Sequence, residues 1–506
     1  MRLSWFAGLA VALVTIATAT ASVATAHRAA QHQMPAAKRL TSLTLGFSAG
    51  ADVAVASGSS STQAFWIPRA QAEGAQMIRL DVNWNSVAPA KPLAGFDPSD
   101  PSSPGYNWTT VDTQVRELTA AHFKIMITVQ FAPKWAEGPN MPKTATAGTW
   151  EPNATDFGEF AQAIAQRYDG SYADPLIPGA SLPRVSYWQA WDEPNLPEYL
   201  APQWAESGSG SYEPVSPTIY RNMQNAFYQA VKAVSPMNYD VQGGLGPYGD
   251  DPSADPEARM RPVAFERDLL CLGENLQETS GCPGPTYFDA VDSHPYGISG
   301  PTSTAYYADD ISVPDVHKLT TVLRAAQQAG TVMPHGVKGN WVTEISWDTD
   351  PPDPQGVPIQ EESRWLEQSL YLLWKQGVST ILWWQLVDSP PIPNYADTYQ
   401  AGVFFLNGAA KPGATAFKFP FITFRSSRTH VTGWGRAPTA GVLVVQKQLK
   451  RGGWETIART RVSARQVFEV PFPLGGSGTL RARLGSYTSL TWSQSAPPAQ
   501  ITLISR

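Results

Sequence analysis

The sequence predicts an α/β protein in which a (β/α)8 TIM barrel at residues 43–418 precedes a small all-β, sandwich-like domain at 419–506. Two observations support this prediction. Through the first region, short apolar segments alternate with helix-like stretches, as in repeated β/α units. The second region shows alternating polar and apolar residues and glycine-rich turns, with no helical period. A doubly wound open sheet is the competing arrangement for the first region.

Eight segments of the first region have the composition of buried strands, because each is short and rich in β-branched or aromatic residues. They are LTLGFS at 43–48, MIRLDV at 77–82, KIMITV at 124–129, VSYWQAW at 185–191, DVQGGL at 240–245, FDAVDSH at 288–294, WVTEIS at 341–346 and TILWWQL at 380–386. Helices are expected between them at 110–121, 156–168, 216–234, 316–329 and 360–376. Ser216-Pro217 predicts a helix start with the serine as N-cap.

The connections that follow the strands are long and rich in proline and aromatic residues, whereas most connections entering the strands are short. The long ones lie at 88–108, 131–150, 196–212 and 348–358. Because the strands of a barrel are parallel, this asymmetry places the elaborated surface at the C-terminal face, where barrel enzymes keep their active sites.

Charge changes sharply at the boundary between the two regions. Residues 419–506 contain twelve Lys or Arg and only two acids, Glu455 and Glu469, for a net charge of +10. Since the whole chain carries −6, the remainder carries −16. A basic surface of this kind either binds an anionic cell-surface polymer or is the solvated face of a stabilising domain.

The N-terminus predicts an export signal at residues 1–26. Met1-Arg2 gives a short positive start, residues 3–21 are apolar and uncharged, and Ala24-Thr25-Ala26 forms a small-residue cleavage pattern. A retained membrane anchor is the alternative, although the threonines and alanines make the segment weakly hydrophobic. Residues 27–42 form a polar linker before the barrel. We therefore expect a secreted or cell-surface protein.

Two cysteines, Cys271 and Cys282, close a short loop. In an oxidising compartment a disulfide is the default for such a pair, and a zinc site would need further ligands that the surrounding sequence does not offer. We expect neither a metal nor a cofactor, and no nucleic-acid partner.

Composition and common motifs narrow the function classes. The 18 tryptophans are typical either of a sugar-binding cleft or of a large core. A dinucleotide-type pattern, Gly244-x-Gly246-x-x-Gly249, follows a predicted strand, but a proline-rich acidic segment comes next where a phosphate-binding helix would have to begin. We interpret it as a glycine-rich loop. The Gly-x-Ser-x-Gly and His-Glu-x-x-His patterns are absent from the sequence.

Two glutamates stand where apolar strands end: Glu193 after SYWQAWD and Glu344 after NWVT. A charged residue at the end of a buried strand is costly unless it is paired or functional. Glycosidic bond cleavage needs such a pair, because one carboxylic acid must protonate the leaving oxygen while an anionic carboxylate attacks or stabilises the anomeric carbon. Their environments must also separate the pKa values of the two acids.

These residues carry a family resemblance. YWQAWDEPN at 187–195 resembles the Trp-x-x-Trp-Asn-Glu-Pro-Asn strand-four motif of retaining glycoside hydrolases of clan A, and WVTEISW at 341–347 resembles their strand-seven nucleophile motif. The sequence is most similar to cellulase-like and family 39-like members, over residues 43–410. The resemblance implies that Glu193 is the general acid/base and Glu344 the nucleophile, with carbohydrate as the substrate.

The resemblance also implies supporting residues. Arg79 resembles the strand-two arginine that supports the nucleophile, and His294 and Tyr296 match strand-six positions that orient the nucleophile or touch sugar. In ILWWQL, Trp384 is preferred over Trp383 as the aromatic platform under the reacting sugar. Core packing is the alternative interpretation for each of these positions.

Asp192 departs from the pattern, since the family has asparagine immediately before the acid/base, where its amide binds the sugar 2-hydroxyl. An aspartate accepts a hydrogen bond from that hydroxyl but cannot donate one. Its charge also tends to raise the pKa of a neighbouring Glu193.

The sequence thus predicts a secreted retaining glycosidase that cleaves the β-linkages of a polysaccharide or glycoside by double displacement. Two alternatives stay open: a carbohydrate-binding or cell-surface protein with weakened catalysis, and a transglycosylase that uses the same residues. The sugar, the linkage and the endo or exo mode of attack are not specified by any pattern.

Overall fold

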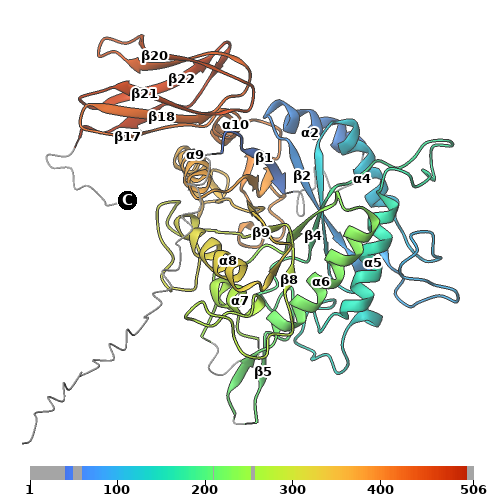
Figure 1. The fold of residues 1–506 in the computed structure, drawn as a ribbon. Coiled ribbons are helices and arrows are strands. Elements are labelled where there is room, and N and C mark those ends of the chain that lie inside the picture. The colour runs from blue at the N-terminus through green and yellow to red at the C-terminus, as the bar shows by residue number, and fades with distance from the viewer. Residues whose placement is uncertain (1–39, 49–59, 209, 252–256, 498–506) are drawn as a thin grey trace, which may run out of the picture. The chain divides into compact units, whose positions relative to one another are not determined.

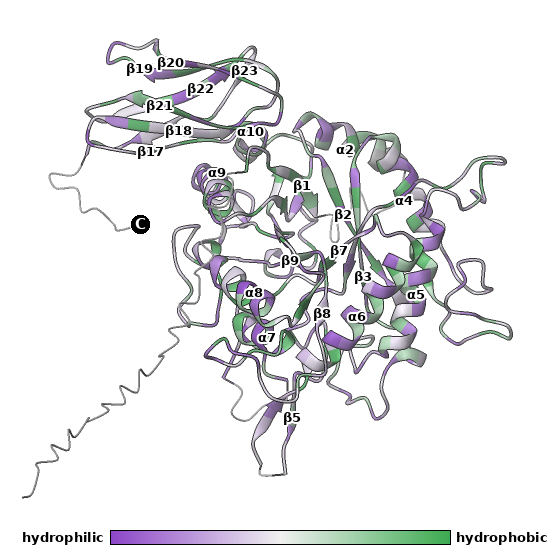
Figure 2. Cartoon of the chain, viewed as in Figure 1, coloured by the Kyte–Doolittle hydropathy of each residue, from purple (hydrophilic) through white to green (hydrophobic). Residues whose placement is uncertain are grey.

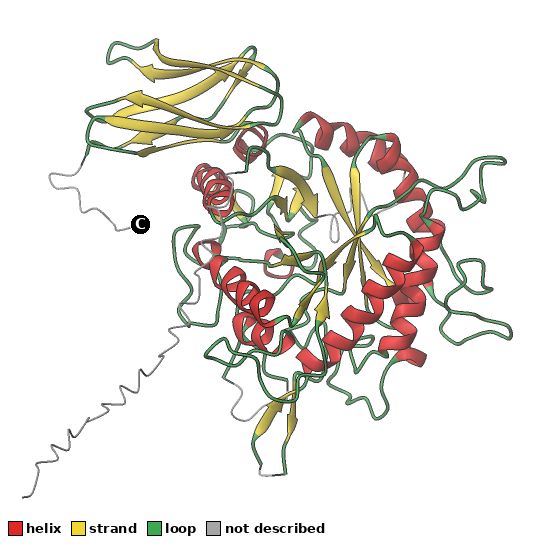
Figure 3. Ribbon diagram, in the orientation of Figure 1, coloured by secondary structure: helices red, strands yellow, loops and turns green. Residues whose placement is uncertain are grey.

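The barrel expected from the sequence is present. The computed structural model describes residues 40–48, 60–208, 210–251 and 257–497. The predicted export signal and residues 27–39 of the predicted linker lie outside this part of the chain. Eight parallel strands form a closed barrel surrounded by helices (Figures 1 and 3), so the competing open sheet is excluded.

Each barrel strand pairs with the one before and the one after it along the chain, and the last pairs with the first. The strands are β1 (Thr44–Ser48), β2 (Met77–Asn83), β3 (Lys124–Gln130), β4 (Tyr187–Ala190), β7 (Tyr239–Gln242), β9 (Ala290–Asp292), β11 (Gly339–Val342) and β14 (Thr380–Trp383). All eight overlap the predicted segments, with the largest offset at β11, which begins two residues before the predicted 341–346 and ends at Val342. They are buried on both faces, because helices cover the outside and side chains fill the interior, which explains their almost continuous apolar sequences.

The helices connect the strands on the outside of the barrel. They are α2 (Ser60–Ala72), α3 (Trp84–Val87), α4 (Thr109–Ala120), α5 (Ala154–Arg167), α6 (Ser216–Val234), α7 (Pro262–Leu269), α8 (His317–Ala329), α9 (Ile359–Lys375) and α10 (Pro412–Lys418), with 3-10 turns at Lys134–Ala136, Val313–Asp315 and Tyr395–Asp397. Figure 2 shows hydrophilic and hydrophobic residues alternating along these helices, as expected for helices with one face against the barrel.

The five helices predicted from periodicity are confirmed to within two residues at each end, whereas α2, α3, α7 and α10 were not predicted. The expected serine cap of α6 is wrong. Val215 occupies the N-cap position, and Ser216 is the first helical residue. The Ser216 hydroxyl instead donates to Gln203 Oε1 at 2.9 Å, which ties the helix start to the preceding loop.

The long connections after the strands carry structure of their own, in agreement with the expected elaborated face. They contain short two-stranded pairs: β5 (Trp204–Glu206) with β6 (Tyr212–Pro214), β12 (Thr349–Asp350) with β13 (Val357–Pro358), and β15 (Gln385–Val387) with β16 (Gly402–Phe404). A further pair, β8 (Thr286–Tyr287) with β10 (Val332–Met333), precedes strands β9 and β11.

The C-terminal region is all-β, as predicted. One sheet has the order β17-β18-β21, and the second has the order β20-β19-β22-β23 with β24 also pairing to β22. Their bounds are β17 (Phe421–Arg425), β18 (His430–Arg436), β19 (Gly441–Gln448), β20 (Trp454–Val462), β21 (Val467–Pro473), β22 (Gly478–Leu484), β23 (Tyr487–Thr488) and β24 (Trp492–Gln494). Buried residues of both sheets, such as Val431 and Leu443, belong to one apolar cluster, so the sheets pack as a sandwich.

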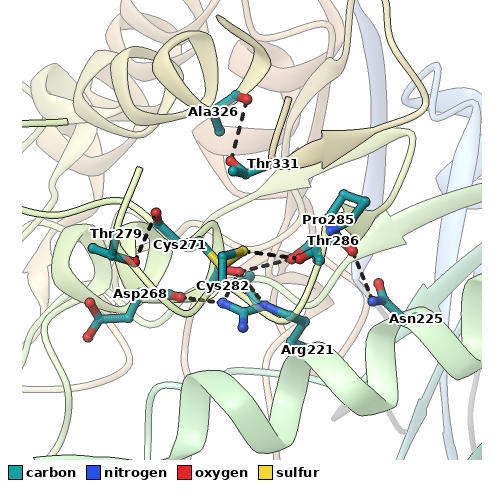
Figure 4. Close-up of a disulfide and its surroundings, with 12 residues drawn as sticks. Arg221, Asn225, Asp268, Cys271, Thr279, Cys282, Pro285, Thr286, Ala326 and Thr331 are labelled. Atoms are coloured by element: carbon teal, nitrogen blue, oxygen red, sulfur yellow. Dashed lines mark hydrogen bonds between the residues drawn. A yellow bond between two sulfur atoms is a disulfide. The ribbon is translucent and has the colours of Figure 1, made fainter. Parts of the chain in front are cut away.

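Cys271 and Cys282 form the expected disulfide (Figure 4). It joins the end of α7 to the segment that leads into β8. Around it, Arg221 of α6 donates to the backbone carbonyls of Asp268 and Leu269, so the loop is also held by hydrogen bonds. Among the described helices, none has both the length and the apolar character needed to cross a membrane.

Candidate active site

Six of the eight residues predicted for the site converge at the C-terminal ends of the barrel strands. They are Arg79 on β2, Asp192 and Glu193 just after β4, His294 and Tyr296 after β9, and Glu344 after β11. Parallel strands that share a barrel end at the same face, so residues more than 250 positions apart meet there. All except Tyr296 are at most 9% exposed.

The backbone turns sharply where the first glutamate is presented. Trp191 and Glu193 both have left-handed backbone conformations, with φ of 70° and 34°. Such conformations are unfavourable for residues with a side chain, and they persist only where the surroundings impose them. Here the Trp191 indole donates to the Tyr199 carbonyl at 2.9 Å, and Asn195 exchanges hydrogen bonds with the backbone of Gly246. These contacts hold the strand-four motif in place.

Arg79 is the central cation of the site. Its side chain is completely buried, and it pairs with Glu344 Oε1 and, at 2.7 Å, with Asp192 Oδ1. The contact with Asp192 is an ion pair without good hydrogen-bond alignment. Arg79 Nε donates to Thr128 Oγ1 at 2.8 Å. Burial alone would lower the pKa of Arg79, but the carboxylates around it, Asp192 foremost, raise it well above the usual value.

His294 lies between the two glutamates. Its Nδ1 is 2.9 Å from Glu193 Oε1 and 3.7 Å from Glu344 Oε2. Its Nε2 is 3.1 Å from Thr343 Oγ1. Burial would lower the pKa of His294, but Glu344 and the neighbouring carboxylates outweigh burial and raise it to about 10. The imidazolium form is therefore favoured at neutral pH as long as the neighbouring carboxylates are ionised.

The Thr343 hydroxyl fixes the orientation of this ring. It donates to Asp292 Oδ2, so it can only accept from His294 Nε2, which must carry a hydrogen. The other ring nitrogen then shares one proton with Glu193: either the imidazolium donates to a carboxylate, or a carboxylic acid donates to the neutral ring. Glu193 and His294 thus form a proton-sharing pair.

Both glutamates hold their protons to higher pH than usual. Burial raises the pKa of Glu344 above its usual value; the opposing effect comes from His294 and Arg79, while the charges of Asp192 and Glu193 add to the rise. Burial also raises the pKa of Glu193, against the hydrogen bond from His294. The two groups titrate as a coupled pair. Glu344 contacts both cations, whereas Glu193 contacts only His294, so a single proton is favoured on Glu193.

Of the remaining predicted residues, Tyr296 contacts Glu344 and Trp384 has a partly exposed ring, whereas Trp383 is buried in the core. The Tyr296 hydroxyl donates to Glu344 Oε2 at 3.0 Å. Trp384 is half-buried and its ring meets Tyr399 edge-on, with centroids 5.7 Å apart. Trp383 is 1% exposed and its indole donates to the Ala401 carbonyl, so its ring offers no face to a ligand.

Four further residues belong to the site and were not predicted. Asp81 lies 3.2 Å from Arg79 Nε, and burial raises its pKa to about 6. Its position two residues after Arg79 on one strand was a signal, because such residues share a face. Asp292 accepts hydrogen bonds from the Gln189 side chain and from the backbone N–H of Thr343, beside His294. Tyr199 and Tyr399 come from loops, and the site carboxylates contribute to raising the pKa of each after burial.

The glycine-rich loop after β7, the fifth strand of the barrel, has a packing role, in agreement with the interpretation of the sequence. A Cβ on Gly244 would lie 2.1 Å from His294 Nε2, and one on Gly246 would lie 2.7 Å from the Leu196 side chain. The glycines therefore allow the loop to approach the site closely. Among the described residues after this loop, 250–251 and 257 onward, no helix begins before α7 at Pro262.

A metal-like arrangement is also present. Donor atoms of Asp192, His294 and Glu344 lie within 4.8 Å of one another, close enough to hold a metal ion. However, the Arg79 guanidinium already contacts both carboxylates of this group, so the chain itself supplies the neutralising charge.

Comparisons with known proteins give the fold. No protein-family model matches this chain, and no curated protein sequence matches it. Among solved structures, a family 39 glycoside hydrolase from Bacteroides cellulosilyticus WH2 superposes with a TM-score of 0.51 at 16% identity, covering 86% of this chain and 81% of that one. A monomeric β-xylosidase from Caulobacter crescentus CB15 gives 0.49 at 14% identity, covering 87% and 96%. The chain thus shares the barrel fold of the family 39 protein.

Proposed function

We propose that this protein is a retaining glycoside hydrolase, with Glu344 as nucleophile and Glu193 as general acid/base. The observation that carries the proposal is the convergence of both glutamates on one nitrogen, His294 Nδ1. The distances of 2.9 and 3.7 Å place Glu193 Oε1 and Glu344 Oε2 no more than about 6.6 Å apart. This upper limit admits the separation of about 5–5.5 Å of retaining enzymes and excludes most of the range of about 6.5–9.5 Å of inverting ones.

The charges of the site suit the two roles. A nucleophile must be ionised, and Glu344 contacts Arg79, lies near His294 and accepts from Tyr296. The acid must carry a proton, and Glu193 shares one with His294. In the first step Glu344 attacks the anomeric carbon while Glu193 protonates the leaving oxygen, which leaves a covalent glycosyl-enzyme. Glu193 then takes a proton from water, which attacks the anomeric carbon and releases the sugar and Glu344.

The first test is substitution of the two glutamates, assayed on aryl β-glycosides and a polysaccharide panel. We expect Glu344→Ala to lose turnover by at least about 10⁴-fold. Glu193→Ala should lose about 10²–10⁴-fold on substrates with poor leaving groups. Azide should partly restore Glu193→Ala, because the anion attacks the glycosyl-enzyme without needing a general base. Full activity in Glu344→Ala would refute the assignment.

The same experiment addresses the two alternatives. Glycan binding without hydrolysis by the unsubstituted protein would identify a binding protein with weakened catalysis. Accumulation of longer glycosides at high acceptor concentration would identify transglycosylation, in which a sugar replaces water in the second step.

We propose Trp384, half-exposed beside Tyr399, as the aromatic platform on which the reacting sugar stacks.

We further propose that the protein works outside the cytoplasm. The disulfide between Cys271 and Cys282 supports this proposal, because disulfides persist in oxidising compartments. The apolar segment at 3–21 and the small-residue pattern ending at Ala26 support it from the sequence. Detection of the protein in the medium, with a mature N-terminus near residue 27, tests the proposal. Retention of the full-length chain in the cytoplasm would contradict it.

We also propose that the outer face of the sheet β20-β19-β22 contacts an anionic cell-surface glycan. Arg459 on β20 and Arg483 on β22 both lie opposite Val444 of β19, so they flank it on one face. Arg461 and Arg481 lie two residues along the same strands and therefore on the same face. Arg481 stacks on the Trp454 ring at 3.9 Å.

No described acid of the C-terminal region opposes these four arginines, termed the arginine face. Glu455 lies opposite Lys447, and the alternation of side chains puts it on the other side of the sheet from Trp454. Glu469 lies on β21 of the other sheet. Three of the arginines are exposed, so the face presents its charge directly to solvent.

Affinity electrophoresis in gels with polygalacturonate tests this contact. The full-length protein should be retarded, and changing Arg459, Arg461, Arg481 and Arg483 to glutamine should abolish the retardation. A control with Lys91, Lys134, Arg324 and Lys375 changed to glutamine loses the same charge from exposed positions of the barrel. Equal loss in both variants, or no retardation of the unsubstituted protein, would refute a specific surface.

A further inference from the structure

A cavity of about 470 Å³ is lined in part by the segment that follows Glu193 and has no role in the chemistry described above. It is walled mainly by the loop that follows β3 and the loop that follows β4, and Glu257 from the segment after β7 completes the lining. Trp150, Trp204 and Pro202 supply apolar surface, and Glu151, Glu198 and Glu257 supply carboxylates. The lining contains no lysine or arginine.

The aromatic walls of the cavity are fixed. Trp150 Nε1 donates to the Pro139 carbonyl at 3.0 Å, and Trp204 Nε1 donates to the Ala258 carbonyl at 2.8 Å. The two loops are joined, because Glu151 N donates to the Ala201 carbonyl at 2.7 Å and Ala201 N donates to the Thr149 carbonyl at 2.9 Å. A ligand would therefore meet ring surfaces that are already in position, which lowers the entropy lost on binding.

The three glutamates give the cavity a negative rim. All three residues are exposed, and Glu257 accepts from Thr144 Oγ1 at 2.5 Å. Arg259 is close enough to Glu198 to interact with it electrostatically, but its guanidinium forms an ion pair with Asp250 at 2.7 Å, so it does not neutralise the rim. Carboxylates around an aromatic wall are the combination that recognises an organic cation, because the ring face and the anions both attract positive charge.

One short segment of chain links the catalytic motif to the cavity. Leu196 N donates to the Glu193 carbonyl at 2.9 Å, and Tyr199 stacks on Phe131 with centroids 5.9 Å apart. Pro197, Glu198 and Ala201 of the same segment line the cavity. A glycan bound at Glu193 thus has this cavity along the same loop.

We propose that this cavity is a subsite for a sugar unit that carries a protonated amine. The ring of the sugar packs on the tryptophan surface while its ammonium group lies among the three carboxylates. The inference rests on the proposed glycoside hydrolase function for its connection to catalysis, and it specifies that function by naming an amino sugar in the substrate. A sugar acid is disfavoured here, since its carboxylate would face three like charges.

Calorimetry on the full-length protein with Glu344→Gln, which prevents turnover, tests the proposal. The probes are a tetramer of β-1,4-linked glucosamine and the same tetramer fully N-acetylated, so that only the amine charge differs. At about pH 5.5, where exposed glutamates are ionised, the amine tetramer should bind about 10-fold more tightly. Equal affinities, or tighter binding of the acetylated tetramer, would overturn the proposal.

Variants locate the effect. Glu151→Gln with Glu198→Gln should remove the preference for the amine and leave affinity for the acetylated tetramer unchanged. Trp150→Ala should weaken both tetramers by a similar factor. The matched control changes Glu117 and Glu361, two exposed glutamates on α4 and α9, to glutamine and should keep the preference. Loss of the preference in the control instead would show that it comes from net charge and would overturn the subsite.

The outcome is separable from that of the proposed function. An enzyme that hydrolyses aryl glycosides but binds both tetramers equally keeps the function and loses the amine subsite. A protein that prefers the amine tetramer but lacks turnover in the unsubstituted form keeps the subsite and loses the function.

Discussion

The barrel mouth and the arginine face of the C-terminal sheet both concentrate charge, but they do so in opposite ways. Arg79, His294 and the surrounding carboxylates are buried and in direct contact. Arg459, Arg461 and Arg483 are exposed and solvated. Coulomb interactions strengthen as water is removed, so buried charges set one another's pKa values and positions. Exposed charges act mainly as a field that salt screens. The charges of the barrel mouth therefore shift the pKa values of neighbouring groups, whereas the charges of the arginine face act on ions and polymers in the solvent.

The largest expected difference concerns stability. Arg79→Ala leaves the Glu344, Asp192 and Asp81 carboxylates without their shared cation, which should cost about 3–5 kcal/mol of unfolding free energy. Arg461→Ala on the arginine face should change stability by no more than about 0.5 kcal/mol. Urea unfolding of both variants measures the contrast. Arg79→Lys should be intermediate, because lysine keeps the charge but not the planar fork. Similar losses at both positions would erase the distinction between the regions.

The next effect concerns the pH dependence of turnover. Asp192 raises the pKa of both Glu193 and Glu344, so Asp192→Asn should allow both to ionise at lower pH. The acidic limb requires ionised Glu344 and the basic limb requires protonated Glu193, so both limbs should move to lower pH, by about one unit. Profiles of kcat/KM measure the shift. Glu117→Gln, on the outside of α4, serves as the control and should leave the profile in place. An unchanged profile in Asp192→Asn would show that its charge is not coupled to the acids.

The smallest effect concerns salt. Raising ionic strength from about 0.05 to 0.5 M should leave KM for an uncharged aryl glycoside within about 2-fold, because buried pairs are screened little. The same change should release the protein from polygalacturonate, since the arginine face is exposed. Salt-sensitive KM together with salt-insensitive retention would reverse the comparison.

Much of the barrel could be predicted because its signal is local. A strand such as KIMITV is apolar on both faces, and this pattern depends only on the residues within it. Elements with a weak local pattern could not be predicted in this way. Helix α2 contains Pro68 and has little apolar periodicity, so its sequence did not indicate a helix that the barrel nevertheless forms. The serine expected to cap α6 was displaced because Gln203, thirteen residues earlier, engages its hydroxyl.

The residues of the site also fall into those that the sequence could predict and those that it could not. Glu193 and Glu344 could be selected because each follows an apolar strand, and the resemblance to clan A glycoside hydrolases indicated Arg79, His294 and Tyr296. The two neighbouring tryptophans could not be told apart with the same clarity, because successive residues of a strand face opposite sides and only the fold decides which side is buried. Trp383 lies in the core, and Trp384 lies beside Tyr399.

By itself, the sequence determined the eight strands, the all-β C-terminal region, the cysteine pair and two glutamates at strand ends, since each is encoded in a short stretch of chain. Only the tertiary structure decided that His294 lies between those glutamates, that Arg79 joins Asp192 to Glu344, and that Trp150 and Glu198 line one cavity. These arrangements depend on which strand ends and loops meet around the closed barrel. Such contacts between distant residues fix the proton's position and the shape of the binding surface.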